Sequence, residues 1–545
     1  MTRRDAAART DVMSGGRSYI LFILMLVYVF NFLDRQILAI LAEDIKADLG
    51  LSDSAMGFLL GTSFAVVYGV FGLALGKAAD VASRKNVIAW SISFWSLMTA
   101  ASGLARSFLP LASARMGVGV GEAGASPAVY SLICDIFPPR FRTTALAFYS
   151  SGIFLGAGIG LFIGGYILTI WQSAFPVPAE APGGLAGWQA AFLIVGFPGL
   201  LLALWVATLR EPPRGSGDGV LVAPHGNPLK AVLQTLMSLV PPFNFAALFV
   251  VGGAAAVLKN LLMMGLVATG VKALIALTGN VYQWVTLGVG IYSVSSWVQH
   301  LALTDRSAFG MLFRCRTVVL SNLGCVGVTF VTAAALGWLP VFFQRYHQAP
   351  ADEVGLVLGL SYATAGFAGV MVGGWMTDRL VAARGAASRL LVIAVALAGA
   401  GLAIAMLVQV PSKWHAYALT IPFNFLSAAC YGPGAANANS LVTPRIRATA
   451  SATYIVIQVL LGTALGPYIV GAVSDSFIAR GWSPGAAVAD GMLVALIALV
   501  PSIILLCVSA TSANADEANR FEREKSFGES GPAEPWGQAT VRCSR

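Results

Sequence analysis

The chain is built from apolar stretches of about 20 residues that recur along nearly its whole length. A helix rises about 1.5 Å per residue, so each stretch can cross the roughly 30 Å hydrocarbon core of a bilayer. Hydrophobic residues make up 57% of the 545 positions and charged residues only 11%, too few to cover a water-soluble surface. The short alternating strands of a transmembrane barrel are not found. The sequence therefore predicts an all-α polytopic membrane protein.

The apolar stretches form two sets of six, with a further pair between the sets. The first set lies within 18–209, the second within 317–509, and the pair at about 243–267 and 281–303. The first set ends before REPPRGSGDG, whose prolines and glycines cannot continue a helix. We therefore expect an N-terminal segment, a six-helix bundle, a linker with two extra spans, a second six-helix bundle and a disordered polar tail: 1–17, 18–209, 210–316, 317–509 and 510–545.

Three short stretches of the first set recur in the second set, in the same order and at a nearly constant offset of about 300 residues. The matching pairs are GKAAD and GWMTD, PRFRTTA and PRIRATA, and LGAGIGLFIGG and LGTALGPYIVG. A repeat of this kind indicates a duplicated bundle. Two parallel six-helix halves are the architecture of the major facilitator fold, which we therefore predict here, with two extra transmembrane helices between the bundles.

The net charge of +9 is explained by membrane topology. When the N-terminus is placed in the cytoplasm, most of the 34 Lys and Arg residues fall on the cytoplasmic side of the predicted spans, as the positive-inside rule requires. No basic patch with interleaved aromatic residues suggests a nucleic-acid partner. We expect a multi-pass protein of the bacterial inner membrane, embedded in the lipid bilayer as a monomer, with both termini in the cytoplasm.

Ionisable residues interrupt two of the predicted spans. NFLDRQ places Asp34 and Arg35 in the first span, and RMGVGVGEAGASP places Arg115 and Glu122 in the fourth. Because ionisable groups in lipid are costly, all four should face a watery cavity or a partner. Counting from the helix ends puts Asp34 and Arg115 at similar depth, so we predict that these two pair, with Glu122 two turns deeper. A static pair that only fixes helix one to helix four remains an alternative.

The second bundle has no comparable charges. Its span at about 414–440 offers polar and aromatic groups instead, among them Asn424 and Tyr431. A cavity between the halves would thus be charged on one wall and polar and aromatic on the other, which suits an amphipathic molecule with a charged head. We expect the head to meet Arg35 and Arg115 beside Asn31.

The segment from Gly76 to Lys85 resembles the loop motif G-x-x-x-D-R-x-G-R-[KR] of the major facilitator superfamily, with Val81 and Ser83 in place of its usual Arg and Gly. Acids and bases at the cytoplasmic rim can pair across the two halves and close an inner gate. Residues that only set the topology are the alternative. The predicted gate comprises Gly76, Asp80, Arg84, Lys85, Asp135, Arg140, Arg142, Asp378 and Arg379.

Glycines recur at every fourth position of the fifth span, at Gly152, Gly156, Gly160 and Gly164. They place a smooth stripe on one helix face, where another backbone can approach closely. The stripe resembles the helix-five motif of proton antiporters in this superfamily, although its usual proline is missing. Tight packing without any bearing on transport direction is equally compatible with it.

Four stretches make the chain similar to the Spinster branch of the major facilitator superfamily: NFLDRQ, RMGVGVGEAGASPA, DIFPPRFRTTA and REPPRG. The resemblance covers about 18–214 and, more weakly, the second half. It implies alternating-access transport of a lysolipid or sphingosine-1-phosphate-like amphiphile, coupled to protons that Asp34 and Glu122 would carry. A proton-coupled organic-anion or multidrug transporter is the alternative, and a passive lipid scramblase or channel is the alternative from another class. The two extra spans depart from the twelve-helix pattern, and the sequence assigns them no function.

The sequence offers no support for an enzyme or for a bound cofactor. GLALGK differs from a phosphate loop in its glycine spacing and lacks the following Ser or Thr, and neither G-x-S-x-G nor H-E-x-x-H occurs. Cysteines and histidines are scattered without metal-ligand spacing. We therefore expect neither a cofactor nor a metal.

Overall fold

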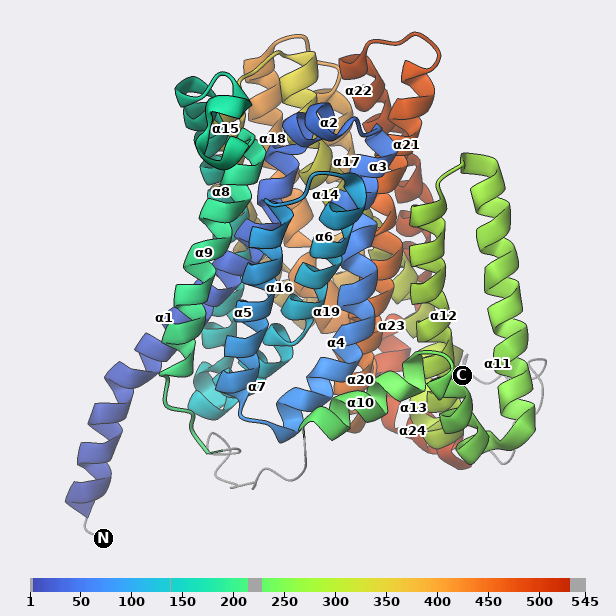
Figure 1. Ribbon diagram of the computed structural model, residues 1–545. Helices are drawn as coiled ribbons and strands as arrows, with labels where there is room; N and C mark the ends of the chain where they lie inside the picture. Colours follow the sequence, from blue (N-terminus) through green and yellow to red (C-terminus); the bar gives the residue numbers. More distant parts are fainter. Residues whose placement is uncertain (1–2, 138, 214–227, 530–545) are drawn as a thin grey trace. The chain divides into compact units, whose positions relative to one another are not determined.

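The computed structural model describes residues 3–137, 139–213 and 228–529, and every regular element within these ranges is a helix (Figure 1). Ten helical stretches of this part are long and apolar enough to span a membrane. The predicted all-α membrane fold is confirmed. The chain divides into two compact units. Unit 1 comprises Met1–Leu49, Phe71–Thr235 and Ala351–Ala363, and unit 2 comprises Gly50–Val70, Leu236–Pro350 and Thr364–Arg545.

The helices that lie in unit 1 or enter it are α1 (Arg3–Ile40), α2 (Ala42–Leu49), α4 (Ser63–Val81), α5 (Arg84–Ser102), α6 (Phe108–Ala123), α7 (Ala125–Ile136), α8 (Pro139–Ala174), α9 (Gly187–Ala207), α10 (Pro228–Leu239) and α15 (Ala351–Ser361). The first residues of α4 and the last residues of α10 belong to unit 2. The units do not coincide with the two sequence halves. The reason is that α15 packs along α8, whereas the stretch before α4 packs along α21 of the second half.

The main helices of unit 2 are α3 (Asp53–Gly57), α11 (Phe243–Thr278), α12 (Val281–Thr304), α13 (Arg306–Phe309), α14 (Arg316–Tyr346), α16 (Phe367–Arg384), α17 (Ala387–Leu407), α18 (Lys413–Ala429), α19 (Tyr431–Ser440), α20 (Arg447–Ile457), α21 (Leu465–Ile478), α22 (Pro484–Ala495), α23 (Leu499–Ala518) and α24 (Arg520–Glu529). Short π-helical segments interrupt them at η1 (Phe58–Thr62), η5 (Gly310–Arg314), η6 (Tyr362–Gly366) and η8 (Gln458–Thr463). The two extra spans, α11 and α12, form a helical hairpin (Figure 1).

Two of the predicted spans are broken helices. The span expected at 109–134 divides into α6 and α7, and that expected at 414–440 divides into α18 and α19. In each case the first helix ends four residues before a proline, at Ala123 before Pro127 and at Ala429 before Pro433. Proline has no N–H to donate to the carbonyl four residues earlier, so the helical ladder is interrupted there.

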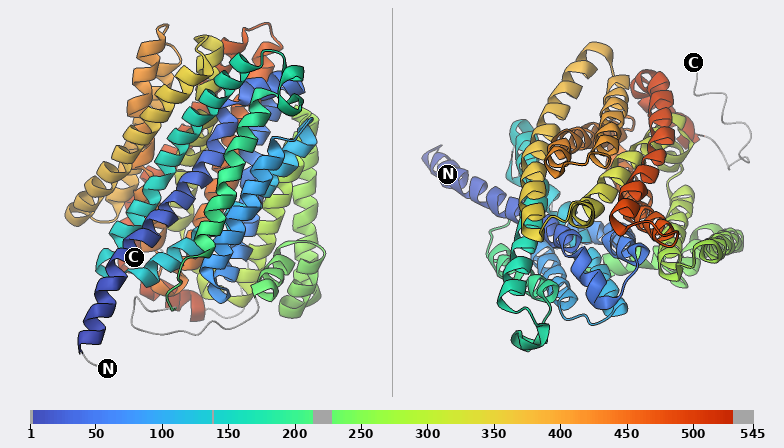
Figure 2. Two further views of the ribbon diagram at one scale, coloured as in Figure 1. Left: turned by 60° about the vertical axis from the view of Figure 1, so that its left-hand side comes forward. Right: turned by 90° about the horizontal axis from the view of Figure 1, so that it is seen from above.

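The glycine stripe of α8 lies directly on α1, and the two helices run side by side (Figure 2). A Cβ atom added at Gly152, Gly156 or Gly160 would meet main-chain atoms of α1 within van der Waals distance. Only glycine lets the two backbones come this close. The stripe therefore fixes α1, the helix that carries Asp34, against α8.

The expected disorder of the C-terminal tail is wrong for residues 510–529, which are helical. Arg523 is buried where it donates to the Leu441 carbonyl at 3.3 Å and lies 3.6 Å from the Asp516 carboxylate. Phe527 packs against Gly310. The tail is polar in sequence, but its few anchoring side chains find buried partners on unit 2.

Candidate functional site

Four ionisable side chains from α1 and α6 meet in the interior of unit 1. Arg35 Nε donates a hydrogen bond to Glu122 Oε2 at 2.6 Å, and Nη2 of the same guanidinium lies 2.5 Å from this oxygen in an ion pair. Arg115 Nη1 donates to the main-chain carbonyl of Asp34 at 3.2 Å. Asp34, Arg115 and Glu122 are 2% exposed or less. We call these four residues the charged cluster.

The predicted pairing of Asp34 with Arg115 is therefore wrong, because the ion pair joins Arg35 to Glu122. Counting residues from the helix ends gives depth but not the direction of a side chain around the helix axis. Adjacent residues point about 100° apart, so the rotation of α1 decides whether Asp34 or Arg35 faces the acid on α6. Arg115 reaches the main chain of Asp34 and contributes its charge to the same cluster.

Glycines in the GVGVGEAG stretch at 117–124 let α6 approach α5 closely. A Cβ at Gly121 would meet the backbone of Trp95 at 2.8 Å, and one at Gly117 would meet the Met98 side chain. Glu122, the residue after Gly121, is consequently held deep between helices. The glycines around the acid are thus part of what positions it.

Several polar neighbours complete the cluster. Asn31, the predicted substrate-binding residue of α1, lies within reach of the Glu122 carboxylate. Trp95 and Thr99 of α5 face the carboxylate of Asp34. The sequence analysis missed Trp95 and Thr99. Their only signal was the four-residue spacing of two polar groups in an apolar span, which is too common to single them out.

Many buried polar atoms of this region have no hydrogen-bond partner. They are Asn31 Oδ1, Asp34 Oδ1, Trp95 Nε1, Thr99 Oγ1, Arg115 Nε and Glu122 Oε1. Each buried group left unsatisfied costs about 1–3 kcal/mol. Native proteins keep such groups rare, so a concentration of them in one place indicates a role other than holding the fold together.

An aromatic row adjoins the charged cluster along α1. The Arg35 guanidinium lies 4.9 Å from the ring centre of Phe32, and Tyr28 one turn further packs edge-on to Phe32 at 5.3 Å. Tyr28 stacks on Tyr149 of α8 at 4.3 Å, and Tyr130 of α7 meets Tyr149 edge-on. Unit 1 therefore places apolar aromatic surface next to the guanidinium of Arg35, whose side chain is 23% exposed.

Three of the predicted gate residues gather around an acid that the sequence analysis did not include, Glu211. Arg84 is buried and pairs with Asp135 and with Glu211, the latter through Nε at 2.9 Å. Lys85 donates to the carbonyls of Ala207 and Leu209 at the end of α9. Burial disfavours the charge of Glu211, but hydrogen bonds from Ser83 and Arg84 hold the pKa of its carboxyl below the ordinary value. Glu211 belongs to the REPPRG stretch, which carries part of the family resemblance, so the sequence could have predicted this residue as part of the assembly.

The other predicted gate residues are not part of this assembly in the described structure. The side chains of Gly76, Asp80, Arg140 and Arg142 lie outside the described residues. Asp378 and Arg379 are exposed on unit 2, where the Arg379 guanidinium lies 4.1 Å from the ring centre of Trp375. Pairing of these groups across the halves remains a prediction.

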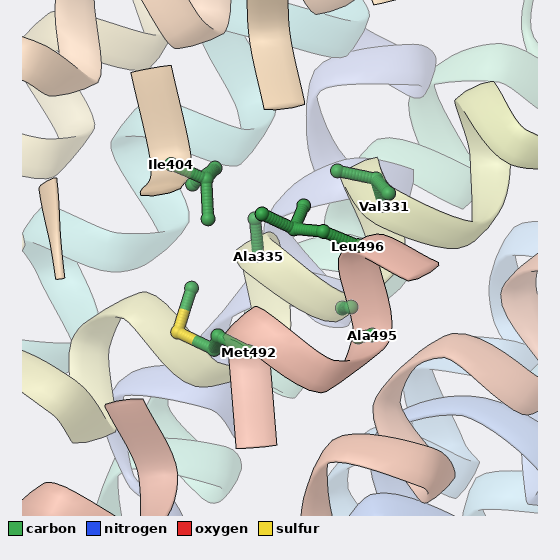
Figure 3. A pocket seen from close by; sticks show the side chains of 7 residues that line it. Val331, Ala335, Ile404, Met492, Ala495 and Leu496 are labelled. Carbon is green, nitrogen blue, oxygen red and sulfur yellow. The ribbon is translucent and has the colours of Figure 1, made fainter. Parts of the chain in front are cut away.

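Asn424 and Tyr431 lie in unit 2, on α18 and α19. Asn424 is buried, whereas Tyr431 is 38% exposed. Neither lines the small pocket of unit 2 shown in Figure 3, which is formed by apolar side chains from α14, α17 and the α22 region: Val331, Ala334, Ala335, Ile404, Met492, Ala495 and Leu496. Without a polar group to orient a ligand, this pocket is a gap in packing rather than a binding site.

Unit 2 contains a second buried ion pair, which the sequence analysis also missed. Asp53, at the start of α3, accepts two hydrogen bonds from Arg345 at 2.8 and 2.9 Å and one from Ser474 at 2.6 Å. The Asp475 carboxylate accepts from the backbone N–H groups of Asp53 and Ser54, each at 2.8 Å. We call this set of residues the latch: Asp53, Arg345, Ser474 and Asp475. The latch joins α3, α14 and α21.

Comparison with known proteins places the chain in a family. The model of the Major Facilitator Superfamily matches residues 24–467. The chain is 28% identical to an MFS-type efflux pump of Mycolicibacterium smegmatis over 90% of this chain and 91% of the relative, and 27% identical to human protein spinster homolog 1 over 88% and 77%. Among solved structures, a bacterial homologue of the human lysosomal transporter Spinster matches 95% of this chain and 99% of its own, with a TM-score of 0.62 at 23% identity. The chain therefore belongs to the Major Facilitator Superfamily and is a membrane transporter, not an enzyme, that is similar to Spinster proteins.

Proposed function

We propose that the protein moves an amphipathic lipid with an anionic head, of the lysolipid or sphingosine-1-phosphate type, across the bacterial inner membrane by proton-coupled alternating access. The observation that carries the proposal is the charged cluster of unit 1, in which the partly exposed guanidinium of Arg35 pairs with the fully buried acid Glu122, beside aromatic surface and with unsatisfied polar groups around it. A phosphate or carboxylate head suits the guanidinium, which binds such groups in two-pronged geometry. An acyl chain suits the row of Phe32 and Tyr28.

The pairing of Arg35 with Glu122 supports a specific coupling step. Ionised Glu122 holds the guanidinium of Arg35 through one hydrogen bond and an ion pair at its Oε2 atom. Protonation of Glu122 removes the charge that holds Arg35 and leaves the guanidinium available to an anionic head. Glu122 thus links proton binding to substrate binding, and Asp34, whose Oδ1 has no hydrogen-bond partner in the described structure, is the second protonatable group.

The proposed topology has both termini in the cytoplasm, which puts Arg84, Asp135 and Glu211 at the cytoplasmic rim. There they would form part of the inner gate together with the predicted residues of the second half. The latch of Asp53 and Arg345 would then lie near the opposite surface.

A drug-like or organic anion is the second candidate substrate, favoured by the relative described as an efflux pump. Passive movement of lipid, as by a scramblase, needs no carboxylate that changes its protonation. These candidates differ in saturation, in proton dependence and in substrate, so one assay can separate them.

The test is uptake into proteoliposomes under an imposed pH gradient, with a lysophospholipid and a short organic acid offered in competition. We expect saturable lysophospholipid uptake that follows the gradient, and loss of this dependence in Glu122→Gln and Asp34→Asn. Asp490→Asn, a carboxylate change on α22, serves as the control and should behave as wild type. Unsaturable movement that ignores the gradient would identify a passive pathway, and selective competition by the organic acid would favour the second candidate.

A further inference from the structure

The side chains of Trp95 and Thr99 occupy one face of α5, four residues apart, opposite the Asp34 carboxylate. Both residues are fully buried. Trp95 Nε1 can only donate a hydrogen bond, and the hydroxyl of Thr99 can donate one as well. Two donors from one helix are therefore aimed at one acid on another.

None of these groups is satisfied elsewhere. Trp95 Nε1, Thr99 Oγ1 and Asp34 Oδ1 all lack a hydrogen-bond partner in the described structure. The charged groups that act on Asp34 are Glu122 and Arg115 of α6. Arg35 on α1 itself is engaged with Glu122, and α9, which packs on α1, carries no ionisable residue. The other helices packed on α1 carry ionisable residues that are not among the groups acting on Asp34, namely Tyr149 and Tyr166 of the described part of α8, Tyr130, Cys134 and Asp135 of α7, Asp352 and Glu353 of α15, and Glu43, Asp44, Lys46 and Asp48 of α2. The two donors of α5 are therefore the uncharged groups best placed to respond to a change in the charge of Asp34.

We infer that Trp95 and Thr99 are positioning residues that hold Asp34 in its ionised form during part of the transport cycle. This inference rests on the proposed function. Donors stabilise a carboxylate and lose that stabilisation when it binds a proton, so they oppose protonation. A small approach of α5 and α1 would satisfy three buried groups at once, which makes the ionised state of Asp34 dependent on helix position.

The test is the pH dependence of uptake by Thr99→Val, which keeps the shape of the side chain but removes its donor. The midpoint should move to higher pH by about one to two units, the size expected for one hydrogen bond to a charged group. Ser102→Ala is the matched control, because this buried hydroxyl of α5 donates to Met98 within its own helix. Trp95→Phe should shift the midpoint in the same direction.

A second readout does not depend on transport. Infrared difference spectra of the purified protein report protonation of buried carboxyl groups, and the band lost in Asp34→Asn belongs to Asp34. We expect the titration of this band to shift in Thr99→Val. An unshifted band in a folded Thr99→Val variant overturns the inference, whereas a shifted band with no pH-dependent uptake overturns the proposed function alone.

A different observation concerns the extra helix α12, which contacts two segments of the core of unit 2. Asn280, just before α12, donates to the Tyr468 hydroxyl of α21 at 2.8 Å and accepts from Ser54 of α3 at 3.4 Å. Thr62 of η1 lies 2.7 Å from both the Gln283 side chain and the Ala464 carbonyl.

The contact continues as close packing along α12. A Cβ at Gly290 would meet Val66 of α4 and Leu460 of η8. The helix α12 therefore packs on two spans at the same time. One is the second span of the first half, formed by η1 and α4, and the other is the eleventh span of the twelve-helix pattern, which contains η8 and α21. Alternating access moves the two halves against each other, so these two spans must change their contact in each cycle. Their facing segments η1 and η8 are π-helical, a local geometry that is frequent at functional sites.

We propose that α12 acts as a brake that stabilises the closed arrangement of the latch. The latch joins the same two spans through Asp53 and Ser474, and α12 adds hydrogen bonds from outside the twelve-helix pattern. When these two spans separate, α12 can keep its contacts with only one of them and loses its hydrogen bonds to the other.

The experiment measures how often the latch opens. Ser474→Cys, placed in a background without native cysteines, is labelled by a membrane-impermeant maleimide only when the latch opens. Adding Asn280→Ala should accelerate labelling about 5- to 10-fold, because each buried hydrogen bond is worth about 1 kcal/mol. Val285→Ala, an exposed position on α12, is the control. Gln283→Leu provides an independent variant, and labelling rates unchanged in both Asn280→Ala and Gln283→Leu would exclude a brake.

Discussion

Two ion pairs, one in each unit, are each built on a fully buried acid, but they differ in how completely the surrounding polar groups are hydrogen-bonded. In the latch, Asp53 accepts three side-chain hydrogen bonds, and Asp475 caps the backbone of α3. In the charged cluster, Arg35 and Glu122 are paired, but six polar atoms around them have no partner. A satisfied network holds one arrangement, whereas an unsatisfied one keeps free energy available for a change of protonation, ligand or helix position. The difference separates a pair that maintains structure from a pair that can switch.

The largest expected effect is loss of stability when the latch is broken. Asp53→Ala leaves the Arg345 guanidinium buried without its acid, which should cost about 3–5 kcal/mol of the free energy of unfolding. Denaturation of the purified protein in detergent measures it. Asp490→Asn is the control. If Asp53→Ala lost less than about 1 kcal/mol of the free energy of unfolding, the latch would not differ from the charged cluster in its contribution to stability.

Substitutions in the stripe of α8 should have the next largest effect. Gly156→Ala pushes a methyl group into the backbone of α1 and should destabilise by about 1–3 kcal/mol while displacing the charged cluster. Gly72→Ala is the matched control, since open space surrounds Gly72 and alanine is the better helix former. Thermal unfolding and uptake are both measured. Equal stability of the two variants would show that the close contact of α8 and α1 is not needed.

Neutralising the charged cluster should change stability little and function strongly. Because Glu122 lies among groups that are already unsatisfied, Glu122→Gln should alter the free energy of unfolding by less than about 1.5 kcal/mol. Its uptake should lose the dependence on a pH gradient. The same denaturation assay used for Asp53→Ala checks the first part. A loss of stability as large as that of Asp53→Ala would contradict the proposed division of roles.

The smallest expected effect concerns Glu211. Its carboxyl has a folded-state pKa below the unfolded value, so the stabilisation from Ser83 and Arg84 is present above the unfolded pKa. It is lost as pH falls through the folded pKa, in the acid range below about 4.3. The thermal midpoint of wild type should therefore fall more steeply on acidification than that of Glu211→Gln. Parallel pH profiles of the two proteins would show that Glu211 does not contribute in this way.

How far the site follows from sequence can be judged from individual residues. That Asp34, Arg35, Arg115 and Glu122 belong together was predictable, because charges inside apolar spans must find one another or water. Which acid meets which base was not, because it depends on the rotation of α1. Glu211 lies in the REPPRG stretch, but the sequence does not show which residues it pairs with. Trp95 and Thr99 look like ordinary residues of an apolar helix.

The sequence by itself determined the helical class, the apolar spans, the duplication and the two helices that carry buried charge. These properties follow from local composition, helical periodicity and repetition along the chain. Only the tertiary structure decided that Arg35 binds Glu122, that Asp53 binds Arg345 across 292 positions of sequence, and that α12 rests on both η1 and α21. Partner choice depends on how helices rotate and cross, which is the summed result of many packing contacts between distant segments.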